Sequence, residues 1–477
     1  MERLVTRPGQ IDQALVNKYS GNGPRYTSYP TAPQFSEEFA VDPYIADQTA
    51  TRLRDVDSLR AAGRDALSIY VHVPFCRDIC YYCACNKVIT RKPGAARRYL
   101  DALRQEIELQ AQLHGDHRPV RQMHWGGGSP TYLDQAEMTE LMHELASNFS
   151  LLDKGYREYS IELDPRTVAE GGIALLKGLG FNRVSLGIQD FDPLVQKSVN
   201  RIQPLGMVRK LVEQVRHFGF RSMSFDLIYG LPHQDRFTME ATLDKVIALR
   251  PDRIACYNYA HLPERFSSQR AIDRLSLPTA AEKLALQEQI AGQLQTAGYL
   301  HIGLDHYVLP DDDLAIAQQR GDLQRNFQGY SVSMAQDLVG LGVSSISQVG
   351  DYYVQNARTL DDYYALLAQG QLPVQRGYQI STEDKLRRHV IMALICNLQL
   401  DTSECKIPDE GDFWQHFASE TVQLRQLQSD GLLEIDAGML RVTERGRPFL
   451  RNICMVFDQH LAPSPGAANA PRYSATV

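Results

Sequence analysis

Short apolar runs alternate with longer amphipathic runs through the first two thirds of the chain. The short runs predict buried strands at 66–73, 120–125, 157–163, 183–188, 222–229 and 253–259, with a seventh at 300–307. The longer runs predict helices at 97–113, 134–146, 205–218, 236–248 and 281–297. In the first of these, Leu100, Leu103, Ile107 and Ala111 fall on one helical face. Strand–helix alternation of this kind predicts parallel βα units with right-handed crossovers.

Six such units favour an α/β fold organised as a partial (β/α)6-type barrel over 56–370. A doubly wound open sheet has the same pattern and stays open as an alternative. Residues 1–55 precede the barrel. Their prolines, glycines and aromatic residues around 21–35 predict an ordered, extended N-terminal arm.

The strand rhythm stops after about residue 375. We expect a helix at 382–400, then a β-hairpin with its turn at Asp436–Gly438 and a helix opening at Thr443. This pattern indicates a mostly helical, winged-helix-like domain over 371–458. The hairpin holds few basic residues, which favours a packing or lid role over DNA binding. The low-complexity end, 459–477, is expected to be disordered.

Composition narrows the class of protein. The chain of 477 residues is 43% hydrophobic and 22% charged, a globular balance. Its net charge of −7 argues against a general affinity for nucleic acid or anionic membranes. No apolar run is long enough to span a membrane, and the first residues do not resemble a signal peptide, so we expect a cytoplasmic protein. Eight cysteines are too few for a disulfide scaffold, and a cytosolic cysteine cluster indicates metal or redox chemistry.

Four of the eight cysteines lie within "CRDICYYCAC", directly after the first predicted strand. Cys76, Cys80 and Cys83 have the spacing C-x3-C-x2-C. Three thiolates on one short loop can hold three irons of a [4Fe–4S] cluster and leave the fourth iron open. A structural zinc site, which usually has a fourth ligand and tight C-x2-C pairs, is the alternative. Cys85 follows Cys83 too closely to serve comfortably as a fourth ligand to the same cluster.

In parallel barrels, functional residues gather at the carboxyl ends of the strands. The second predicted strand runs into "GGGSP" (126–130), whose glycines allow a close approach of the backbone to a ligand. Polar or small residues at the ends of the later strands are Glu162, Gln189 with Arg201 shortly after, Asp226 and Ala260. A carboxylate within an apolar strand, such as Asp226, is costly to bury without a partner, which favours a ligand contact.

The cysteine spacing is the signature of the radical S-adenosylmethionine (SAM) enzymes, and this loop resembles it closely. The resemblance extends over about residues 20–458, in the right order, to "GPRYTSYPT", "YVHVPFC", "CACNK", "GGGSPTYL", "IELDPR", "GIQDF", "VNRIQ", "DLIYGLP", "NYAHLP", "RNFQGY", "GVSSIS" and "RNICMVFD". Together these segments resemble the oxygen-independent coproporphyrinogen III oxidases (dehydrogenases) of haem biosynthesis.

This resemblance implies a radical decarboxylation. Two propionate side chains of coproporphyrinogen III would lose CO2 and hydrogen to become vinyl groups, giving protoporphyrinogen IX. A 5′-deoxyadenosyl radical, formed by one-electron cleavage of SAM at the cluster, would abstract the hydrogen. The family also implies two SAM molecules and an electron donor protein such as a flavodoxin or ferredoxin. We expect a monomer with no nucleic-acid or membrane partner.

Site residues follow from the matching positions. Cys76, Cys80 and Cys83 would bind the cluster, with Tyr82 packed beside it. The expected SAM contacts are Tyr70, Gly127, Gly128, Ser129, Glu162, Gln189, Arg201, Asp226, Ala260 and Ile346, with Gln328 reaching the second SAM. Cys85, His72, Arg25 and Arg325 are the candidates for catalysis, for proton handling and for binding the acidic porphyrinogen. His72 equally fits a core histidine whose hydrogen bonds are satisfied.

Two alternatives remain open. A haem-binding or trafficking chaperone on the same scaffold usually has Phe where this chain has Cys85, and a paralogous radical SAM enzyme would act on another tetrapyrrole. The chain also departs from the family pattern. Ser129 replaces an expected Thr, Ala84 an expected Gly, and "SVSMAQ" (331–336) stands where a Thr pair and a glycine are usual. The last departure affects the expected pocket for the second SAM or the porphyrinogen.

Overall fold

A computed structural model describes residues 13–54, 56–92, 94–115, 118–153, 156–332, 337–408, 411–436, 438–461, 473 and 476. They form two compact units. The barrel unit comprises residues 35–278 and 333–379, and the terminal unit comprises residues up to 34, 279–332 and those from 380 onward. Each unit is described by itself.

The predicted ranges 1–55, 56–370, 371–458 and 459–477 stay a prediction. The compact units group the chain differently, because residues 279–332 belong with the terminal unit. Of the expected disordered tail, only 459–461, 473 and 476 are among the described residues. Most of the divergent "SVSMAQ" run, 333–336, lies outside them as well.

Parallel strands form the centre of the barrel unit. They are β1 (Leu67–Val73), β4 (Pro119–Gly127), β6 (Glu158–Leu163), β7 (Arg183–Gln189), β8 (Ser222–Tyr229) and β9 (Arg253–Asn258). Each pairs in parallel with the next one in this list. The strand order therefore follows the chain in one direction, as in a barrel, whereas a doubly wound sheet reverses its order. The partial-barrel prediction is confirmed, and all six strands lie where they were predicted.

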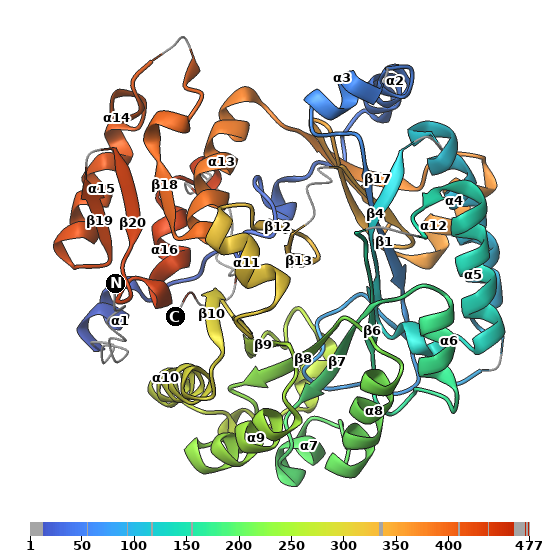
Figure 1. Cartoon of the computed structure of the whole chain (residues 1–477), viewed down its shortest axis with the longest axis horizontal. Helices are drawn as coiled ribbons and strands as arrows, with labels where there is room; N and C mark the ends of the chain where they lie inside the picture. The colour runs from blue at the N-terminus through green and yellow to red at the C-terminus, as the bar shows by residue number, and fades with distance from the viewer. Residues whose placement is uncertain are drawn as a thin grey trace. The chain divides into compact units, whose positions relative to one another are not determined.

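Helices follow the strands, and Figure 1 shows α4, α5, α6 and α8 along one side of the sheet. The helices of this unit are α2 (Val41–Arg52), α3 (Val56–Ala61), α4 (Arg97–His114), α5 (Gln135–Asn148), α6 (Gly172–Gly178), α7 (Pro193–Ser198), α8 (Leu205–His217), α9 (Arg236–Leu249) and α12 (Leu360–Ala368). Predicted Leu100, Leu103 and Ile107 of α4 are buried. Asp134 begins α5 with a capping box, since its side chain accepts from the Glu137 amide.

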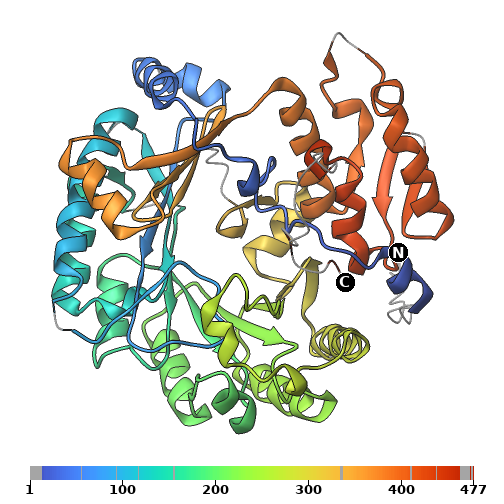
Figure 2. The same cartoon turned by 180° about the vertical axis from the view of Figure 1, so that it is seen from behind.

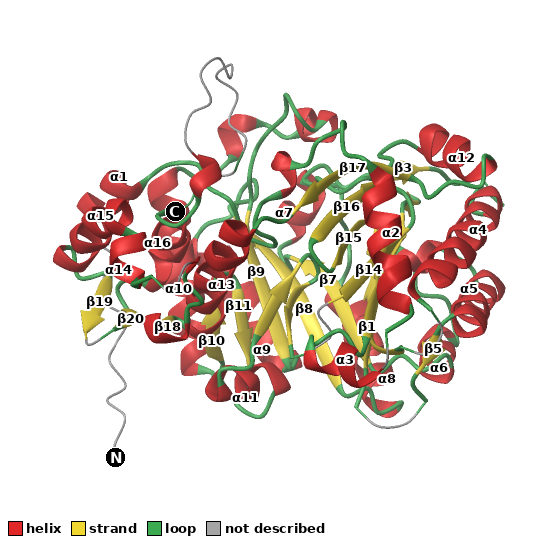
Figure 3. Cartoon of the chain, turned by 90° about the horizontal axis from the view of Figure 1, so that it is seen from above, coloured by secondary structure: helices red, strands yellow, loops and turns green. Residues whose placement is uncertain are grey.

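The sheet continues past β1 with four more strands, of which the first is parallel to β1 and the next three alternate in direction. β14 (Asp337–Leu341) pairs in parallel with β1, and β15 (Ile346–Val349), β16 (Tyr352–Asn356) and β17 (Val374–Gln379) follow as an antiparallel meander. Figure 3 shows these strands in one row with β1 (yellow), and Figure 2 shows the same meander from behind in orange. Two short strands, β2 (Phe75–Cys76) and β3 (Val88–Ile89), pair beside β1, and β5 (Ser150–Leu151) pairs with β4.

The terminal unit is mostly helical. Its elements are α1 (Gln13–Tyr19), α10 (Ala280–Thr296), β10 (Leu300–Gly303), β11 (His306–Val308), α11 (Asp313–Arg320), β12 (Gln324–Asn326), β13 (Gly329–Ser331), α13 (Thr382–Asn397), β18 (Gln399–Asp401), α14 (Phe413–His416), α15 (Ala418–Ser429), β19 (Leu433–Asp436), β20 (Met439–Val442) and α16 (Leu450–Met455). One apolar core, which includes Leu394, Phe417 and Phe449, holds them together.

Two predictions in this unit are wrong. The seventh strand, 300–307, is an antiparallel pair of β10 and β11, because Leu304 adopts a positive φ of 44° and reverses the chain. The helix predicted from Thr443 begins only at Leu450. Thr443 instead closes a turn, in which its Oγ1 accepts from the Gly446 amide at 2.9 Å. The hairpin at Asp436–Gly438 is confirmed, and the predicted helix at 382–400 is α13. Among the described helices, none has the length and apolarity needed to cross a bilayer.

Candidate active site

A row of polar side chains crosses three neighbouring strands of the barrel unit. Strand register places Tyr70 of β1 opposite His124 of β4, and His124 opposite Ser160 of β6. Because side chains alternate along a strand, His72 and Glu162 lie on the same face as this row. The Tyr70 and His124 rings stack at 5.9 Å. The Nδ1 atom of His124 lies 2.6 Å from Ser160 Oγ, and its Nε2 donates a hydrogen bond to Glu162 Oε1 at 3.1 Å.

His72 is held by three groups. Its Nε2 donates to the Asn86 carbonyl at 3.0 Å, so its Nδ1 accepts from the Tyr70 hydroxyl at 3.1 Å. Tyr99 donates to the His72 carbonyl at 2.5 Å. Burial lowers the pKa of His72, so the ring is neutral and its proton lies on Nε2. Its hydrogen bonds are satisfied, as in a core histidine, although it stands beside the cysteine loop.

The cysteine loop starts and ends on a pair of strands. Cys76 ends β2, which pairs with β3 after the loop returns. Between them, the Cys83 amide donates to the Cys80 carbonyl at 3.1 Å. Asn200 donates to the Ile79 carbonyl at 2.7 Å, and Gln269 donates to the Tyr82 carbonyl at 3.1 Å. The loop is therefore fixed by side chains from distant parts of the sequence.

A cavity of about 160 Å³ opens beside this loop. The predicted residues that line it are Cys76, Cys80, Tyr82, Cys83, Cys85, Gly127, Gly128, Ser129, Glu162, Gln189, Arg201 and Asp226. The glycine run shapes its wall. Gly127 has a φ of +116°, and a Cβ there would lie 2.7 Å from the His72 ring. A Cβ on Gly128 would lie 2.6 Å from the Pro74 carbonyl oxygen. Glycine is thus needed at both positions.

Two guanidinium groups point at one of the cysteines. Arg166 Nη2 lies 3.5 Å and Arg201 Nη1 lies 3.7 Å from Cys80 Sγ. Asp164 holds both arginines, each at 2.8 Å. Burial would raise the pKa of Asp164, but Arg166 and Arg201 lower it, so the carboxylate is ionised. Arg201 is buried, and its Nε has no partner among the described residues.

The donor set fits an iron–sulfur cluster. Burial, followed by the neighbouring Cys83 and Cys80, raises the pKa of Cys76 to about 12. The thiolate form of Cys76 therefore needs positive charge beside it, which a metal cluster and Arg201 would supply. In the described part of the chain, no three His, Cys, Asp or Glu side chains are grouped to hold a single metal ion.

Asp226 lies within β8, and its Oδ2 accepts from Ser185 Oγ at 2.8 Å. Burial, and next the charge of Glu162, raise the pKa of Asp226 to about 7 from its ordinary value of 3.8. Glu162 also accepts from the Gly127 amide at 3.3 Å. The floor of the cavity thus presents two carboxylates with hydrogen-bonding capacity for the hydroxyl or amino groups of a ligand.

Other predicted residues lie elsewhere. Tyr70 and His72 belong to the polar row. Ala260 follows β9 and Ile346 begins β15, and neither Ala260 nor Ile346 is among the residues that line the described cavity. Arg25, Arg325 and Gln328 belong to the terminal unit. Arg25 pairs with Asp305 at 2.9 Å, and Arg325 lies 4.7 Å from the centre of the Tyr330 ring. Among the described residues, Arg325 Nε and Nη1 and both amide atoms of Gln328 are buried without a hydrogen-bond partner.

Sequence reasoning missed several residues of the site. His124 lies in "MHWGGG", two residues before the glycine run, and only its register with Tyr70 shows its place. Asp164 and Arg166 lie within the quoted segment "IELDPR", where they look like surface charges. Lys87 was also missed, and its Nζ donates to the Cys83 carbonyl at 3.1 Å. Of these residues only Lys87 lies close to the cysteines in the sequence, so its charge was the available signal.

Comparison with known proteins agrees with this geometry. The model of the Radical SAM superfamily matches residues 70–246, and that of the HemN C-terminal domain matches residues 380–449. The chain is 47% identical over 466 residues to a protein of Pseudomonas aeruginosa named oxygen-independent coproporphyrinogen III oxidase, covering 98% of each chain. A protein of Escherichia coli with the same name is 43% identical over 450 residues, covering 94% of this chain and 95% of the relative.

A solved structure is similar over nearly the whole chain. Coproporphyrinogen III oxidase (HemN) from Escherichia coli, described as a radical SAM enzyme, aligns with a TM-score of 0.87 and 42% identity. The alignment covers 95% of this chain and 99% of that one. Both the catalytic region and the C-terminal region are therefore shared with these relatives. The chain belongs to the oxygen-independent coproporphyrinogen III oxidase family of radical SAM enzymes.

Proposed function

We propose that this protein oxidatively decarboxylates two propionate side chains of coproporphyrinogen III to vinyl groups without oxygen, giving protoporphyrinogen IX. One observation carries the proposal: the three cysteines of the signature share one cavity with the glycine run, Glu162 and Arg201. The names of relatives at 43–47% identity support the same reaction. Radical SAM family membership implies a [4Fe–4S] cluster and SAM.

We assign the cluster to Cys76, Cys80 and Cys83, which leaves one iron for SAM. When bound, the cluster and SAM supply a carbon radical able to take hydrogen from an unactivated carbon. Arg166 and Arg201 stabilise the sulfur ligand of Cys80 through charge-assisted hydrogen bonds.

The protein around the cluster binds and orients SAM. Gly127 and Gly128 bring the backbone close to it, and Glu162, Gln189, Arg201 and Asp226 offer polar contacts around the cavity. Two SAM molecules remain part of the proposal. Tyr70, Ala260, Ile346 and Gln328 are the proposed contacts that the described cavity wall does not include.

The substrate carries carboxylates, and the terminal unit offers cations for them. Among the described residues, two buried nitrogen atoms of Arg325 and the side-chain amide of Gln328 have no hydrogen-bond partner. A guanidinium group can bind a propionate with two parallel hydrogen bonds. We propose Arg325 and Arg25 as propionate contacts, with Arg25 released from Asp305 when substrate binds.

Cys85 and His72 are the proposed residues for proton and hydrogen handling. The Cys85 residue is exposed, in contrast to the buried Cys80. His72 is neutral, and its only proton is donated to the Asn86 carbonyl. His72 can therefore act as an acid only after its hydrogen bond to the Asn86 carbonyl breaks. Its Nδ1, in contrast, can exchange a proton directly with the Tyr70 hydroxyl.

The setting of the reaction is also proposed. All eight cysteines are free, which supports a reducing compartment such as the cytoplasm. The net charge of −7 supports a protein that does not bind nucleic acid. We propose a monomer that takes its electrons from a flavodoxin or ferredoxin.

An anaerobic assay tests the function. Reconstituted protein should contain roughly four iron and four sulfide per chain and convert coproporphyrinogen III to vinyl products only with SAM and a reductant. Cys83→Ala should lose iron, and Cys405→Ala, a thiol of the terminal unit, should keep both iron and activity. No vinyl product from protein with verified cluster and SAM would reject the proposal. Tight haem binding, no SAM turnover and no effect of Cys85→Ala would favour the chaperone alternative.

A further inference from the structure

The cysteine loop and its return strand carry an unusual local charge. Between residues 77 and 98 the only acidic residue is Asp78, and the basic residues are Arg77, Lys87, Arg91, Lys92, Arg97 and Arg98. The local net charge of +5 contrasts with −7 for the whole chain. A basic patch in an acidic protein attracts an acidic partner by long-range electrostatics.

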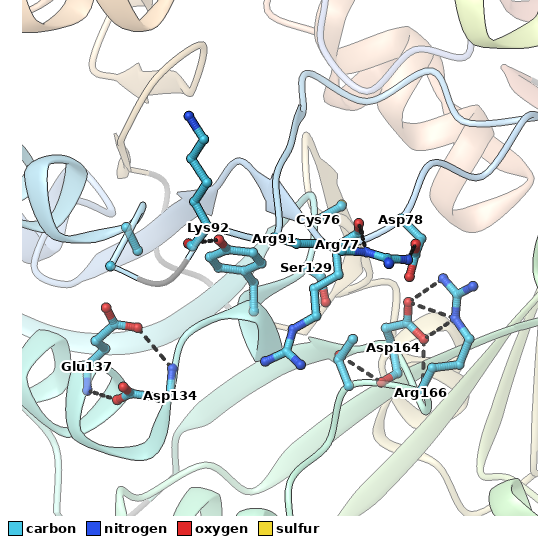
Figure 4. Close-up of a pocket in the computed structure, with 14 residues that line it drawn as sticks. Cys76, Arg77, Asp78, Arg91, Lys92, Ser129, Asp134, Glu137, Asp164 and Arg166 are labelled. Atoms are coloured by element: carbon cyan, nitrogen blue, oxygen red, sulfur yellow. Dashed lines mark hydrogen bonds and ion pairs between the residues drawn. The ribbon is translucent and has the colours of Figure 1, made fainter.

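Part of this segment lines a second cavity, of about 620 Å³, on the barrel unit (Figure 4). Arg77, Arg91 and Lys92 line it, and all three are exposed. Cys76 lines both this cavity and the smaller one that holds the other cysteines. Of the three signature cysteines, Cys76 is the one that lines both cavities among the described residues.

Each acidic residue that lines the second cavity has a hydrogen-bond or ion-pair partner. Asp164 is held by Arg166 at 2.8 Å. Asp134 and Glu137 bond each other's backbone amides in the cap of α5. Asp78 pairs with Arg91.

The side chains of Arg77 and Lys92, in contrast, have no hydrogen-bond or ion-pair partner within the described ranges. These two cations lie on the side of the cavity formed by the cysteine loop and its return strand, whereas the charges of Asp134 and Glu137 lie apart from them in the cap of α5. Figure 4 shows Lys92 extending away from the other labelled side chains.

We propose that the surface formed by Arg77, Arg91 and Lys92 is the docking site of an acidic one-electron carrier protein. The proposal rests on the proposed function, because cleaving SAM consumes one electron that must enter the cluster from outside. The carrier is oxidised by one electron and the cluster is reduced by one. Cys76 gives that electron the most direct entry, since it borders both cavities.

The test compares two reductants on reconstituted holoenzyme. Arg77→Gln combined with Lys92→Gln removes the two unpaired cations. Arg209→Gln combined with Lys210→Gln is the matched control, because it removes an exposed Arg–Lys pair on α8. Cluster reduction is followed by stopped-flow absorbance, with either a reduced flavodoxin of negative net charge or dithionite. The measured quantity is the ratio of the flavodoxin rate to the dithionite rate, so a change in the cluster itself cancels.

The first pair should lower this ratio about tenfold at low ionic strength, and the loss should shrink as salt is added. The control pair should leave the ratio unchanged. An unchanged ratio in the Arg77–Lys92 variant, or an equal fall in the control, would overturn the proposal. Reduction needs no porphyrinogen, so protein that is reduced normally but forms no vinyl product would contradict the proposed function and not this inference.

Discussion

SAM binding should weaken as the medium is acidified, and Asp226 is the group responsible. Its carboxyl is half-buried, and desolvation together with Glu162 raises its pKa to about 7. Below that pH the free protein holds Asp226 protonated, and above it the group is a carboxylate. We expect SAM to require the carboxylate, because its hydroxyl and amino groups donate hydrogen bonds. Binding at low pH must then first remove a proton, so affinity falls as the pH falls.

The magnitude follows from the fraction of protein in the competent form. With a pKa of about 7, the ionised fraction is about 0.9 at pH 8 and about 0.1 at pH 6. The apparent Kd is the intrinsic Kd divided by that fraction, so it should rise about tenfold between pH 8 and pH 6. Ser185 supplies the hydrogen bond that lowers this pKa. Ser185→Ala should therefore move the midpoint of the pH dependence upward.

Equilibrium dialysis of labelled SAM with anaerobic, reconstituted protein gives the Kd at each pH. Asp226→Asn should bind SAM more weakly at pH 8 and show no slope between pH 6 and pH 8. A flat profile in the parent protein would refute the reasoning. So would a slope that persists in Asp226→Asn, because another group would then carry the titration.

Other perturbations act through buried polar groups. Asp337→Asn removes the carboxylate that pairs with the buried Arg118 at 2.5 Å and with Arg64 at 2.8 Å. The cost of about 3–5 kcal/mol should lower the Tm in calorimetry by roughly 10 °C. Glu106→Gln should cost about 1–3 kcal/mol in urea unfolding, because its buried carboxylate accepts three donors and an amide nitrogen cannot accept one of them. Arg166→Gln removes a charged donor near Cys80, so iron and sulfide should be lost about tenfold faster under chelator, as expected for roughly 1.5 kcal/mol; an unchanged loss rate would count against the role.

The sheet could be predicted because parallel strands leave a strong signal. β1 is buried on both faces except at Tyr70, so its sequence is a nearly continuous apolar run bounded by polar residues. The run at 300–307 also has apolar or aromatic residues at 300, 302, 304 and 307, but a reversal at Leu304 divides it. Composition records burial and not backbone direction, so this hairpin could not be separated from a strand by pattern.

The site was predicted unevenly for a similar reason. Cysteine spacing is local, so ten residues of sequence were enough to predict that Cys76, Cys80 and Cys83 lie together, and all three line one cavity. His124 depends on the pairing of β4 with β1 and β6, which no short segment encodes. Its role as a donor to Glu162 became evident only when the register was known.

Thiol spacing alone does not make the site, because the loop between β2 and β3 must also hold its shape. Asn200 and Gln269 bond its backbone carbonyls from more than a hundred residues away, and His72 bonds the Asn86 carbonyl near its end. Ordering this loop only when a cluster arrives would cost roughly 1–2 kcal/mol per residue. Because these side chains hold the loop, its conformational entropy is lost when the barrel unit folds and not when the cluster binds. The three sulfur atoms are therefore positioned by the fold, and a short C-x3-C-x2-C segment lacking these distant donors would not hold a cluster in the same way.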